Sequence, residues 1–438
     1  MSLPSLIEIV PLTGPVHAEI TVPGSKSITN RALILAALAQ GKVTLTGALW
    51  SEDTQIMVEC LHKLGFDVEV LTDPTEACNR SITVQGQGGR IPPGGTEAQP
   101  LELFVGNAGT AARFLAPFLC LGSGVYRLSG VPRMHERPQA ALFKALRELG
   151  YRVDAESNND KLPARIYGEG PLAGKCTVSI AASSQFASAL LLSAGLGGWL
   201  VSITGENADE SPYVAMTSKL VAGFPVQGGV FQIEPDASSG SYFWAAGVVW
   251  PDQPNIATRP PFPVTVASWP EVELQIDSQF PRRVPISGVS SSAAISRQTD
   301  LGDSIMTAIV IAPFFTAPLQ FTDLGRLRVQ ECERVAALKT ELTKCGAQVI
   351  EEGDTLTVYP SPLQGAEIET YNDHRMAMCF AILGLKVPGI RLKNPACVKK
   401  TFPNFFQKLA APVPQGLGAR ILDGHTGRPL ALEELFAD

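Results

Sequence analysis

The sequence predicts an α/β protein built of two similar lobes. Three observations predict it: the chain has 438 residues, helical and strand patterns alternate along it, and the same order of elements recurs six times. Alternating helices and strands indicate helical layers packed on sheets. Three units in each half give two lobes, and the boundary is expected near Pro235–Asp236.

The first unit shows the pattern most completely. A polar loop, Pro23–Ser27, runs into an apolar helical stretch that ends at Gly41, and the half-buried strand KVTLTG follows. Ser51 has the position of a helix N-cap, with Glu52 and Asp53 in the first turn of the next helix. The strands FDVEV and SITVQG complete the unit.

The other five units also begin with a polar loop that enters a helix. Their opening residues are Gly106–Thr110, Ala182–Gln185, Asp236–Ser239, Gly302–Ser304 and Tyr371–Arg375. The fourth unit is irregular, because residues 251–290 are rich in Pro and Ser and hold little periodicity beyond VTVAS and VELQI. A loop-rich insertion is expected there.

The composition is that of a well-buried globular protein, with 45% apolar and 18% charged residues. No apolar run reaches the ~18 residues of a membrane span, and the N-terminus lacks the features of a secretory signal, so a cytoplasmic location is expected. The net charge of −7 provides no global basic field for nucleic acid. The eight scattered cysteines show no zinc spacing and are expected to be reduced core thiols.

The helix openings are candidate anion sites. Helix N-termini expose N–H groups that carry a partial positive charge and bind phosphates and carboxylates. Ser, Asp and Asn are also ordinary caps, which explains most such loops. Several openings, however, carry a cation in or near the first turn: Lys26, Arg31, Arg113 and Arg375. The helix dipole disfavours a cation there unless an anion lies between the two.

Other cations cluster in three short segments. They are Arg133 and Arg137 in PRMHERP, Arg328 and Arg334 around Glu331 in RLRVQECER, and Lys399 and Lys400 in VKKTFP. These residues are either solvated charges or a set that converges on a small, multiply charged molecule. PGSKS lacks the earlier Gly of a P-loop, and GQGGRIPPGG runs into Pro-Pro rather than a helix, so neither predicts a nucleotide site.

Eight segments carry a resemblance to a known family. They are VPGSKSITNRALILAALA, GNAGTAARFL, PRMHERP, ASSQFASALL, DASSGSYF, RVQECERVAAL, TYNDHRMAMCF and KKTFPNFF. In this order they resemble the 5-enolpyruvylshikimate-3-phosphate (EPSP) synthase family over nearly the whole chain. The resemblance implies a two-lobed inside-out α/β barrel of six βαβαββ-type repeats, three per lobe. In that family the first strand returns to the C-terminal lobe, so the expected lobes are residues 12–235 and residues 1–11 plus 236–438.

The resemblance also implies a reaction. It is transfer of the enolpyruvyl group of phosphoenolpyruvate to the 5-hydroxyl of shikimate 3-phosphate, by addition and then elimination of phosphate. An acid must protonate the methylene carbon and a base must take the hydroxyl proton. Glu331 resembles that acid, Asp303 resembles that base, and Lys26 lies near the reacting hydroxyl. No metal or organic cofactor is implied, and a monomer whose partners are these two substrates, without nucleic acid or membrane, is expected.

The remaining site residues carry over by motif. Those implied to bind shikimate 3-phosphate are Lys26, Ser27, Arg31, Ser183, Ser184, Gln185, Asp303, Arg326 and Gln330. Those implied to bind phosphoenolpyruvate are Lys26, Asn107, Gly109, Thr110, Arg113, Arg137, Gln185, Arg334, His374, Arg375 and Lys400. Arginine suits this role because its planar fork binds carboxylate and phosphate groups at two points.

Four positions depart from the family pattern. Gln330 stands where a Lys commonly contacts the acceptor phosphate, Glu210 where a Ser often does, and Arg326 where an Asn is common. These changes leave open an enzyme that acts on a different phosphorylated or nucleotide-linked acceptor. Phe114 stands where a Pro commonly follows the loop arginine, which predicts altered sensitivity to glyphosate, an occupant of the phosphoenolpyruvate site.

Two rival functions are compatible with the same fold. The cell-wall enolpyruvyl transferase that acts on a UDP-amino sugar carries a reactive Cys shortly before the arginine that corresponds to Arg137, and Gly130–Arg137 contains no Cys. A catalytically silent relative that binds anions would keep the fold, but Asp303, Glu331 and Lys26 are all present.

Overall fold

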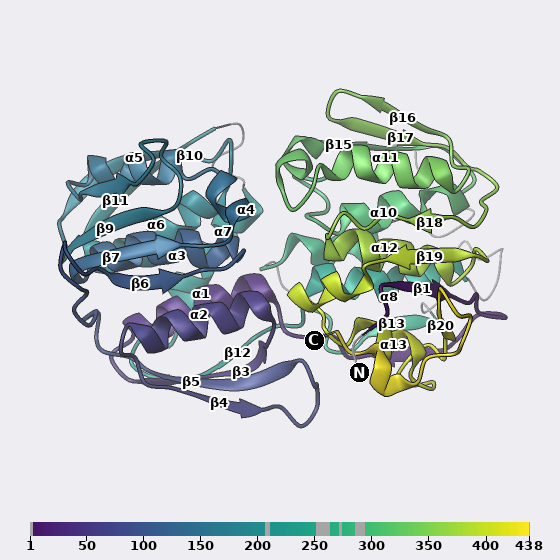
Figure 1. Ribbon diagram of the computed structural model, residues 1–438, viewed down its shortest axis with the longest axis horizontal. Coiled ribbons are helices and arrows are strands. Elements are labelled where there is room, and N and C mark those ends of the chain that lie inside the picture. The colour runs from purple at the N-terminus through teal and green to yellow at the C-terminus, as the bar shows by residue number, and fades with distance from the viewer. Residues whose placement is uncertain (1–2, 206–210, 251–262, 271–273, 285–293, 438) are drawn as a thin grey trace. The chain divides into compact units, whose positions relative to one another are not determined.

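The structure is a computed structural model that describes residues 3–205, 211–250, 263–270, 274–284 and 294–437. The chain forms two compact units of mixed α/β structure (Figure 1). The N-terminal unit is Gly24–Glu234, and the C-terminal unit combines Met1–Pro23 with Pro235–Asp438.

The first boundary lies after Pro23, whereas the sequence placed it at residue 12. The reason is a long-range pairing: β2 (Ala18–Ile20) lies parallel to β13 (Val264–Val266), with Ala18 opposite Val264. A parallel partner some 245 positions away gives no local signal in the sequence. The second boundary, at Glu234–Pro235, lies within one residue of the expected one.

The N-terminal unit contains helices and sheets in alternation. Its helices are α1 (Lys26–Leu38), α2 (Glu52–Lys63), α3 (Gly109–Cys120), α4 (Pro132–Glu136), α5 (Ala140–Glu148), α6 (Gln185–Gly197) and α7 (Pro212–Gly223). Its strands are β3 (Lys42–Leu49), β4 (Val68–Thr72), β5 (Asn79–Gln85), β6 (Leu101–Phe104), β7 (Ser123–Ser129), β8 (Val153–Ala155), β9 (Ala164–Glu169), β10 (Gly174–Ser179), β11 (Trp199–Thr204) and β12 (Gly229–Gln232). The described residues form sheets of order β12-β3-β5-β4, β6-β7-β9-β8 and β10-β11.

The C-terminal unit repeats this organisation. Its helices are α8 (Ala237–Val249), α9 (Phe280–Arg283), α10 (Ile305–Ile311), α11 (Arg334–Lys344), α12 (His374–Gly384) and α13 (Phe405–Ala410), with 3-10 turns η1 (Ile276–Gln279), η2 (Ala312–Phe314), η3 (Leu324–Val329), η4 (Pro395–Lys400) and η5 (Leu432–Leu435). Besides β2 and β13, its strands are β1 (Leu6–Ile9), β14 (Ile295–Ser296), β15 (Leu319–Thr322), β16 (Val349–Glu352), β17 (Thr355–Val358), β18 (Glu367–Ile368), β19 (Ile390–Lys393) and β20 (Ile421–Asp423). Their sheet orders are β18-β19-β1-β20, β13-β2 and β14-β15-β17-β16.

A parallel strand pair recurs in every one of these sheets. In the N-terminal unit the parallel pairs are β12 with β3, β6 with β7, and β10 with β11. In the C-terminal unit they are β13 with β2, β14 with β15, and β18 with β19. The other pairings in these sheets are antiparallel. Because parallel neighbours need a crossover connection, this arrangement agrees with alternating helices and strands.

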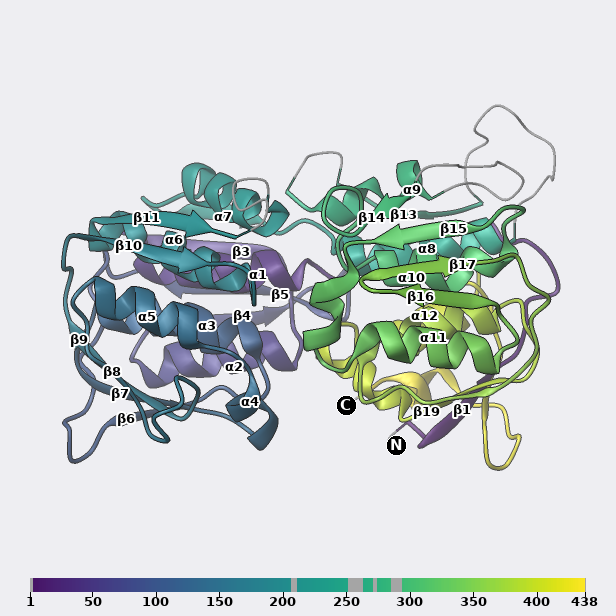
Figure 2. The ribbon, with the colours of Figure 1, turned by 90° about the horizontal axis from the view of Figure 1, so that it is seen from above.

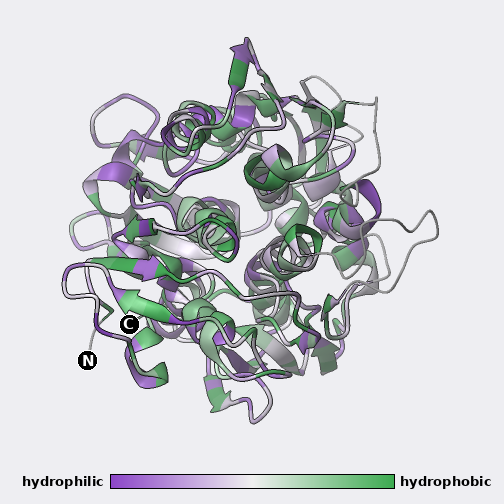
Figure 3. Ribbon diagram, turned by 90° about the vertical axis from the view of Figure 1, so that its right-hand side faces the viewer, coloured by the Kyte–Doolittle hydropathy of each residue, from purple (hydrophilic) through white to green (hydrophobic). Residues whose placement is uncertain are grey.

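Three helices form the buried centre of each unit. In the N-terminal unit α3 packs on both α1 and α6, and every residue of α3 is buried. In the C-terminal unit α8, α10 and α12 pack on one another, and every residue of α8 and α10 is buried. Figures 1 and 2 show each set of helices side by side, and Figure 3 shows hydrophobic colour on helices inside the molecule. The apolar helical stretches of the sequence therefore become core helices.

Most elements expected from the sequence are present at the expected positions. The helices that begin at the six polar openings are confirmed, as is the strand KVTLTG. Within the expected insertion at 251–290, the described residues form β13, η1 and α9, and the rest of that segment lies outside the described residues. The turns α4, η3 and η4 were not anticipated, because they are short and carry no periodic pattern.

Two other expectations concern the whole chain. Among the residues that the structure describes, no helix is both long and apolar enough to cross a bilayer. All eight cysteines are free thiols; seven are buried and Cys332 is half-buried. Burial raises the pKa of several of these thiols, for example that of Cys176 to about 11, so they are predominantly protonated near neutral pH.

Candidate functional site

The first turns of α1, α3 and α6 are joined by side chains in the N-terminal unit. Asn30 Nδ2 of α1 donates to Thr110 Oγ1 of α3 at 3.0 Å. Arg113 Nη1 of α3 donates to Gln185 Oε1, at the start of α6, at 2.6 Å. The N-terminal ends of these helices therefore lie together, which brings the predicted residues of three separate motifs to one end of the helical core.

Lys26 begins α1 and lies beside a carboxylate. Its Nζ is 3.2 Å from Asp53 Oδ2, and the Asp53 side chain is only 4% exposed. The sequence identified Asp53 as a helix-start residue of α2, but it did not pair Asp53 with Lys26. Ser27, next to Lys26, is half-buried, and its carbonyl oxygen accepts a bond from Arg31.

Arg31 is held inside the N-terminal unit. Its side chain donates to Thr217 Oγ1 at 2.8 Å, to Ser188 Oγ at 3.0 Å and to the Ser27 carbonyl at 2.8 Å, and the residue is 1% exposed. Burial lowers the pKa of Arg31 to about 10. The Phe114 ring lies 5.1 Å from the guanidinium carbon. These contacts explain why Arg31 can lie near the first turn of α1 without a bound anion. The expected contact of Arg31 with shikimate 3-phosphate stays a prediction.

The loop before α3 lies against Arg137. Arg137 follows α4, and its Nη1 donates to the Asn107 carbonyl oxygen at 3.3 Å. A Cβ atom added to Gly109 would lie 2.8 Å from Arg137 Nη2 and 2.9 Å from Nη1. Only the absence of a side chain at Gly109 lets the guanidinium lie against the start of α3. The residues expected at the phosphoenolpyruvate loop, Asn107, Gly109 and Thr110, are thus beside Arg137.

The start of α6 presents the ASSQ motif. Ser183 Oγ accepts a bond from the Gln185 N–H at 3.2 Å, Ser184 is buried at the N-cap, and no acidic residue lies in the first turn. Gln185 accepts from Arg113, which also stacks on Phe186 with 5.4 Å between guanidinium carbon and ring centre. A helix N-terminus flanked by hydroxyls and an arginine suits an anion.

In the C-terminal unit, Asp303 lies among three arginines. Its Oδ1 accepts from Arg297 Nη2 at 2.7 Å, while Oδ2 lies 3.4 Å from Arg375 Nε and 3.7 Å from Arg334 Nη1. Burial alone would raise the pKa of Asp303, but the three guanidinium groups outweigh it and hold that pKa well below its usual range. Asp303 is therefore ionised in these surroundings.

Glu331 is shared by two cations. Its Oε2 accepts from Arg334 Nη2 at 2.9 Å, and its Oε1 accepts from Lys400 Nζ at 3.0 Å. The Glu331 side chain is 15% exposed and that of Lys400 is 11% exposed. The RVQECER and KKTFP motifs, about 70 positions apart, are thus in direct contact.

Arg334 joins these carboxylates to the start of α12. It donates from Nε to Asp373 Oδ2 at 2.7 Å and from Nη2 to Asp373 Oδ1 at 3.2 Å, and it is 1% exposed. Burial opposes its charge, but Asp373, Glu331 and Asp303 outweigh burial and raise the pKa of Arg334. Asp373 also caps α12 by accepting from the Arg375 N–H at 2.9 Å. His374, a predicted ligand, is 2% exposed beside this cap.

One residue that departs from the family pattern, Gln330, lies in the same cluster. Gln330 Nε2 is 3.5 Å from Asp303 Oδ1, and Gln330 Oε1 accepts from Arg334 Nη1. Arg326 is half-buried in η3. Glu210, the third departure, lies outside the described residues. Gln330 therefore places a neutral amide group beside the Asp303 carboxylate.

Sequence reasoning missed several members of this cluster. Arg297 was not selected, although it is a lone cation in the uncharged run SSSAAISRQT. Asp277 was missed as well; its Oδ1 accepts from the Ser304 N–H at 2.7 Å, beside Asp303. Burial, and then the charge of Asp303, raise the pKa of Asp277. Asp373 was noticed only as part of the NDHR opening.

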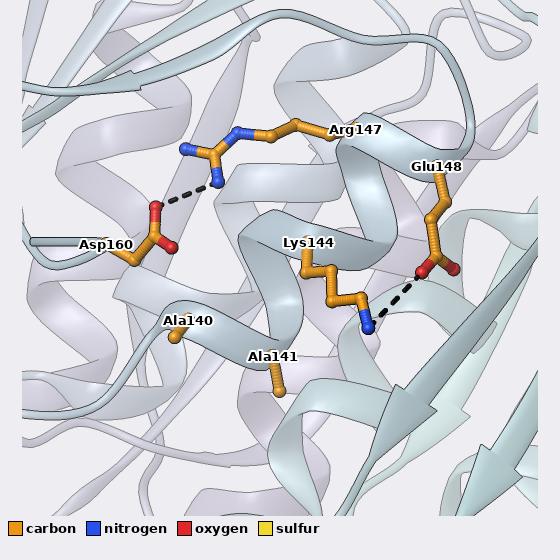
Figure 4. Close-up of a pocket in the computed structure, with 6 residues that line it drawn as sticks. All are labelled: Ala140, Ala141, Lys144, Arg147, Glu148 and Asp160. Atoms are coloured by element: carbon orange, nitrogen blue, oxygen red, sulfur yellow. Dashed lines mark ion pairs between the residues drawn. The ribbon is translucent and has the colours of Figure 1, made fainter. Parts of the chain in front are cut away.

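A surface hollow elsewhere contains none of the predicted residues. It has a volume of about 510 Å³ and lies along α5, where it is lined by Ala140, Ala141, Lys144, Arg147, Glu148 and Asp160 (Figure 4). Its charges are paired locally, with Arg147 2.8 Å from Asp160 and Lys144 3.8 Å from Glu148. The hollow therefore offers no unmatched charge for a multiply charged ligand.

Comparison with known proteins identifies the family. The sequence profile described as EPSP synthase (3-phosphoshikimate 1-carboxyvinyltransferase) matches residues 11–409. The chain belongs to the EPSP synthase family. A relative named 3-phosphoshikimate 1-carboxyvinyltransferase from Nostoc punctiforme is 37% identical over 435 residues, covering 92% of this chain and 98% of the relative. One of the same name from Opitutus terrae is 38% identical over 440 residues, covering 94% and 98%.

Solved structures of EPSP synthases share the fold. An EPSP synthase from Acinetobacter baumannii aligns with a TM-score of 0.71 at 22% identity, covering 95% of this chain and 99% of that one. The enolpyruvyl transferase NikO from Streptomyces tendae aligns with a TM-score of 0.66 at 16% identity, covering 96% and 99%. At these identities the likeness supports the mixed α/β fold.

Replacing Gly109 by Ala in this EPSP synthase family member is expected to displace the Arg137 guanidinium. The new methyl group would lie under 3.0 Å from both terminal nitrogens. We expect KM for phosphoenolpyruvate to rise about tenfold, because a charge-assisted contact is weakened, while kcat changes less. The matched control is Gly195→Ala in α6, where an added Cβ meets nothing within 4 Å. An unchanged KM in Gly109→Ala would show that Arg137 does not bind the donor.

Proposed function

We propose that this chain transfers the enolpyruvyl group of phosphoenolpyruvate to the 5-hydroxyl of shikimate 3-phosphate. The observation that carries the proposal is the C-terminal cluster, in which Asp303 and Glu331 share the contacts of Arg334 and lie next to Arg375 and Lys400. Two carboxyl groups and three cations are what the reaction needs: a base, an acid and ligands for an anionic donor. The named relatives support the same reaction.

Each unit contains residues that we propose as ligands of the donor. In the N-terminal unit the proposed donor ligands are Arg113 and Arg137 with the loop of Asn107, Gly109 and Thr110, and Gln185 lies beside Arg113. In the C-terminal unit they are Arg334, Arg375 and Lys400, together with His374. The phosphate and carboxylate of phosphoenolpyruvate would compete with Glu331 and Asp303 for these cations. Binding would therefore loosen Lys400 and Arg334 from Glu331 and leave that carboxyl group able to carry the proton that it delivers.

The acceptor is proposed to bind through hydroxyl groups and cations. Ser183 and Ser184 at the start of α6 suit its phosphate, because they flank a helix N-terminus. Lys26, Ser27 and Arg31 on α1, together with Gln185, are the other proposed ligands in the N-terminal unit. Asp303, Arg326 and Gln330 are those in the C-terminal unit.

Glu331 and Asp303 would both act in the addition step, and Glu331 would act again in the elimination step. Glu331 gives a proton to the methylene carbon, while the acceptor oxygen bonds to the neighbouring carbon and passes its proton to Asp303. The tetrahedral product still bears phosphate. Glu331 then takes a proton back from the methyl group as the phosphate leaves, which restores the double bond, and Asp303 gives up the hydroxyl proton to the departing phosphate or to water. Arg334, Arg375 and Lys400 stabilise the charge that develops on the leaving phosphate.

The finer architecture forms part of the same proposal. In the part of the chain that the structure describes, six sheets, each with one parallel pair, and two sets of three buried helices support six repeats arranged as two inside-out barrels. We propose a cytoplasmic monomer of the shikimate pathway that needs neither a metal nor an organic cofactor. Its partners are its two substrates rather than nucleic acid or membrane.

Phosphate release tests the function directly. Purified protein is mixed with phosphoenolpyruvate and shikimate 3-phosphate, and inorganic phosphate is measured over time, with each substrate omitted in turn as a control. Release that requires both substrates is the expected result. Release only with another phosphorylated or nucleotide-linked alcohol would remove the acceptor half of the proposal. Tight binding of phosphoenolpyruvate without release for any acceptor would indicate a silent relative.

A different acceptor is the second candidate, and Gln330 is the observation that favours it. The side chain beside Asp303 Oδ1 is neutral at this position, where the family commonly has a Lys that contacts the acceptor phosphate. Arg297, 2.7 Å from the same oxygen, places a positive charge there instead. A panel of acceptors with and without the 3-phosphate, compared by kcat/KM, distinguishes the two candidates.

Phe114 is expected to affect inhibition by glyphosate. The ring is fully buried in the second turn of α3 and stacks on Arg31, so its replacement changes the packing beneath the Gly109–Thr110 turn. We expect Phe114→Pro to change the inhibition constant for glyphosate. Because a proline inside a helix costs about 3 kcal/mol, Phe114→Leu is measured beside it as the milder variant. Inhibition constants equal to that of the wild type in both would refute the effect.

A further inference from the structure

Arg297 is a charged residue of the C-terminal unit that no motif assigned to the site. It lies in the turn after β14, six positions before Asp303, and its side chain is 9% exposed. Its Nη2 donates to Asp303 Oδ1 at 2.7 Å, whereas Gln330, Arg375 and Arg334 lie 3.4 to 3.7 Å from the carboxylate oxygens. Arg297 therefore makes the shortest of these contacts with Asp303.

Contacts of other groups hold the backbone of the turn that carries Arg297. The Arg297 N–H donates to the Thr322 carbonyl oxygen at 3.1 Å, which continues the β14–β15 pairing. Asp300 Oδ2 accepts from the Ser296 N–H at 2.9 Å, and Arg283 Nη2 lies 3.2 Å from Asp300 Oδ1. Because these contacts hold the backbone, the Arg297 side chain is available for a role other than fixing the turn.

The two oxygens of Asp303 have different surroundings. Arg297 and the neutral Gln330 lie on the side of Oδ1, whereas the arginines proposed to bind the donor, Arg334 and Arg375, lie on the side of Oδ2. Asp277 lies beside the backbone that leads into Asp303, where its carboxylate accepts from the Ser304 N–H. A short charge-assisted bond on one oxygen fixes the rotation of the carboxylate and so the direction of the other oxygen.

We propose that Arg297 is a positioning residue for the reaction: it holds Asp303 by Oδ1 so that Oδ2 is directed to the acceptor hydroxyl. The inference rests on the proposed function, in which Asp303 is the base. Arg297 itself touches neither substrate. Its effect appears in proton removal and not in donor binding, since Arg334 and Arg375 keep their places. Without Arg297 the carboxylate would turn toward those two guanidinium groups.

A double-mutant cycle tests this role. Turnover and KM are measured for the wild type, Arg297→Gln, Asp303→Asn and the double variant, with phosphate release as the readout. We expect Arg297→Gln to lower kcat about tenfold or more and to leave KM for phosphoenolpyruvate within about twofold. In the Asp303→Asn background the same change should cost less than about twofold, because the carboxylate that Arg297 orients is already absent. Arg297→Lys, which keeps the charge, should recover part of the lost kcat.

The matched control is Arg283→Gln, which removes the α9 arginine that contacts Asp300 in this turn without touching Asp303. Wild-type kcat is expected for it. Equal losses from Arg297→Gln in both backgrounds, or an Arg283→Gln variant as slow as Arg297→Gln, would overturn the proposal, because the arginines would then act only through the fold of the turn.

Folding is checked by circular dichroism and thermal unfolding. If Arg297→Gln does not fold, Gln330→Lys is added to return a cation to the side of Oδ1. Recovered folding and turnover in Arg297→Gln/Gln330→Lys support the proposal, and a double variant that still does not fold contradicts it. A wild-type protein that releases no phosphate overturns the proposed function and this inference together. A fully active wild type with an additive cycle overturns the inference alone.

Discussion

Replacing Glu331 by Gln is expected to lower kcat by about 10²-fold or more. The methylene carbon of the donor becomes reactive only when a proton is delivered to it, and an amide at position 331 cannot deliver one. The change is nearly isosteric, and because Arg334 and Lys400 bond to different oxygens of Glu331, at 2.9 Å and 3.0 Å, an amide keeps one of these contacts and leaves the other cation to the donor. Donor binding should therefore fall far less than turnover, and KM for phosphoenolpyruvate should change only a few-fold.

Steady-state phosphate release and single-turnover formation of the product measure this effect. Glu352→Gln is the control, since Glu352 is an exposed glutamate on β16 of the same unit. Its kcat should equal that of the wild type. Turnover of Glu331→Gln close to the wild-type value would remove Glu331 from the role of acid and make Asp277, a buried carboxyl group near Asp303, the next candidate.

The helix starts could be predicted because capping is local. Asp236 and Asp373 cap α8 and α12 through side-chain bonds to backbone N–H groups two or three residues ahead, as such residues do in many helices. The strand order is not local. The pairing of β2 with β13 joins Ala18 to Val264, and no pattern within either segment indicates it. The early boundary was therefore misplaced although the elements were found.

The site likewise has features that could be predicted from local sequence and features that could not. Motifs selected Lys26, Arg334 and Lys400, since Lys26 lies at a polar helix opening and the other two lie in short cationic segments of an acidic chain. Which carboxylate meets which cation depends on packing between distant segments: Lys400 meets Glu331 across 69 positions, and Lys26 meets Asp53 across 27. Arg31 illustrates the limit, because its motif implies a ligand contact while each of its three guanidinium nitrogens donates to Ser27, Ser188 or Thr217.

Replacing Asp303 by Asn is likewise expected to lower kcat by about 10²-fold or more, for a different reason. The amide keeps an oxygen for the bond from Arg297 but has no basic oxygen to take the hydroxyl proton. Because Arg375, Arg297 and Arg334 hold the pKa of the wild-type carboxyl well below its usual range, Asp303 is ionised throughout ordinary assay conditions. The loss should therefore appear at every pH between about 6 and 9 rather than at one end of the profile.

The Asp303→Asn variant also leaves three guanidinium groups around a neutral side chain. Its effect on donor binding can therefore be distinguished from its effect on turnover. A phosphoenolpyruvate dianion should then bind at least as well as in the wild type, because Arg334 and Arg375 lose a competing carboxylate. Unchanged or tighter donor binding, measured by calorimetry, together with the loss of kcat is the expected combination. Asp300→Asn, three positions earlier in the same turn, is the control and should keep wild-type turnover, because its amide oxygen can still accept from the Ser296 N–H that holds the turn. Weaker donor binding in Asp303→Asn with near-normal kcat would mean that Asp303 organises the arginines and that another group removes the proton.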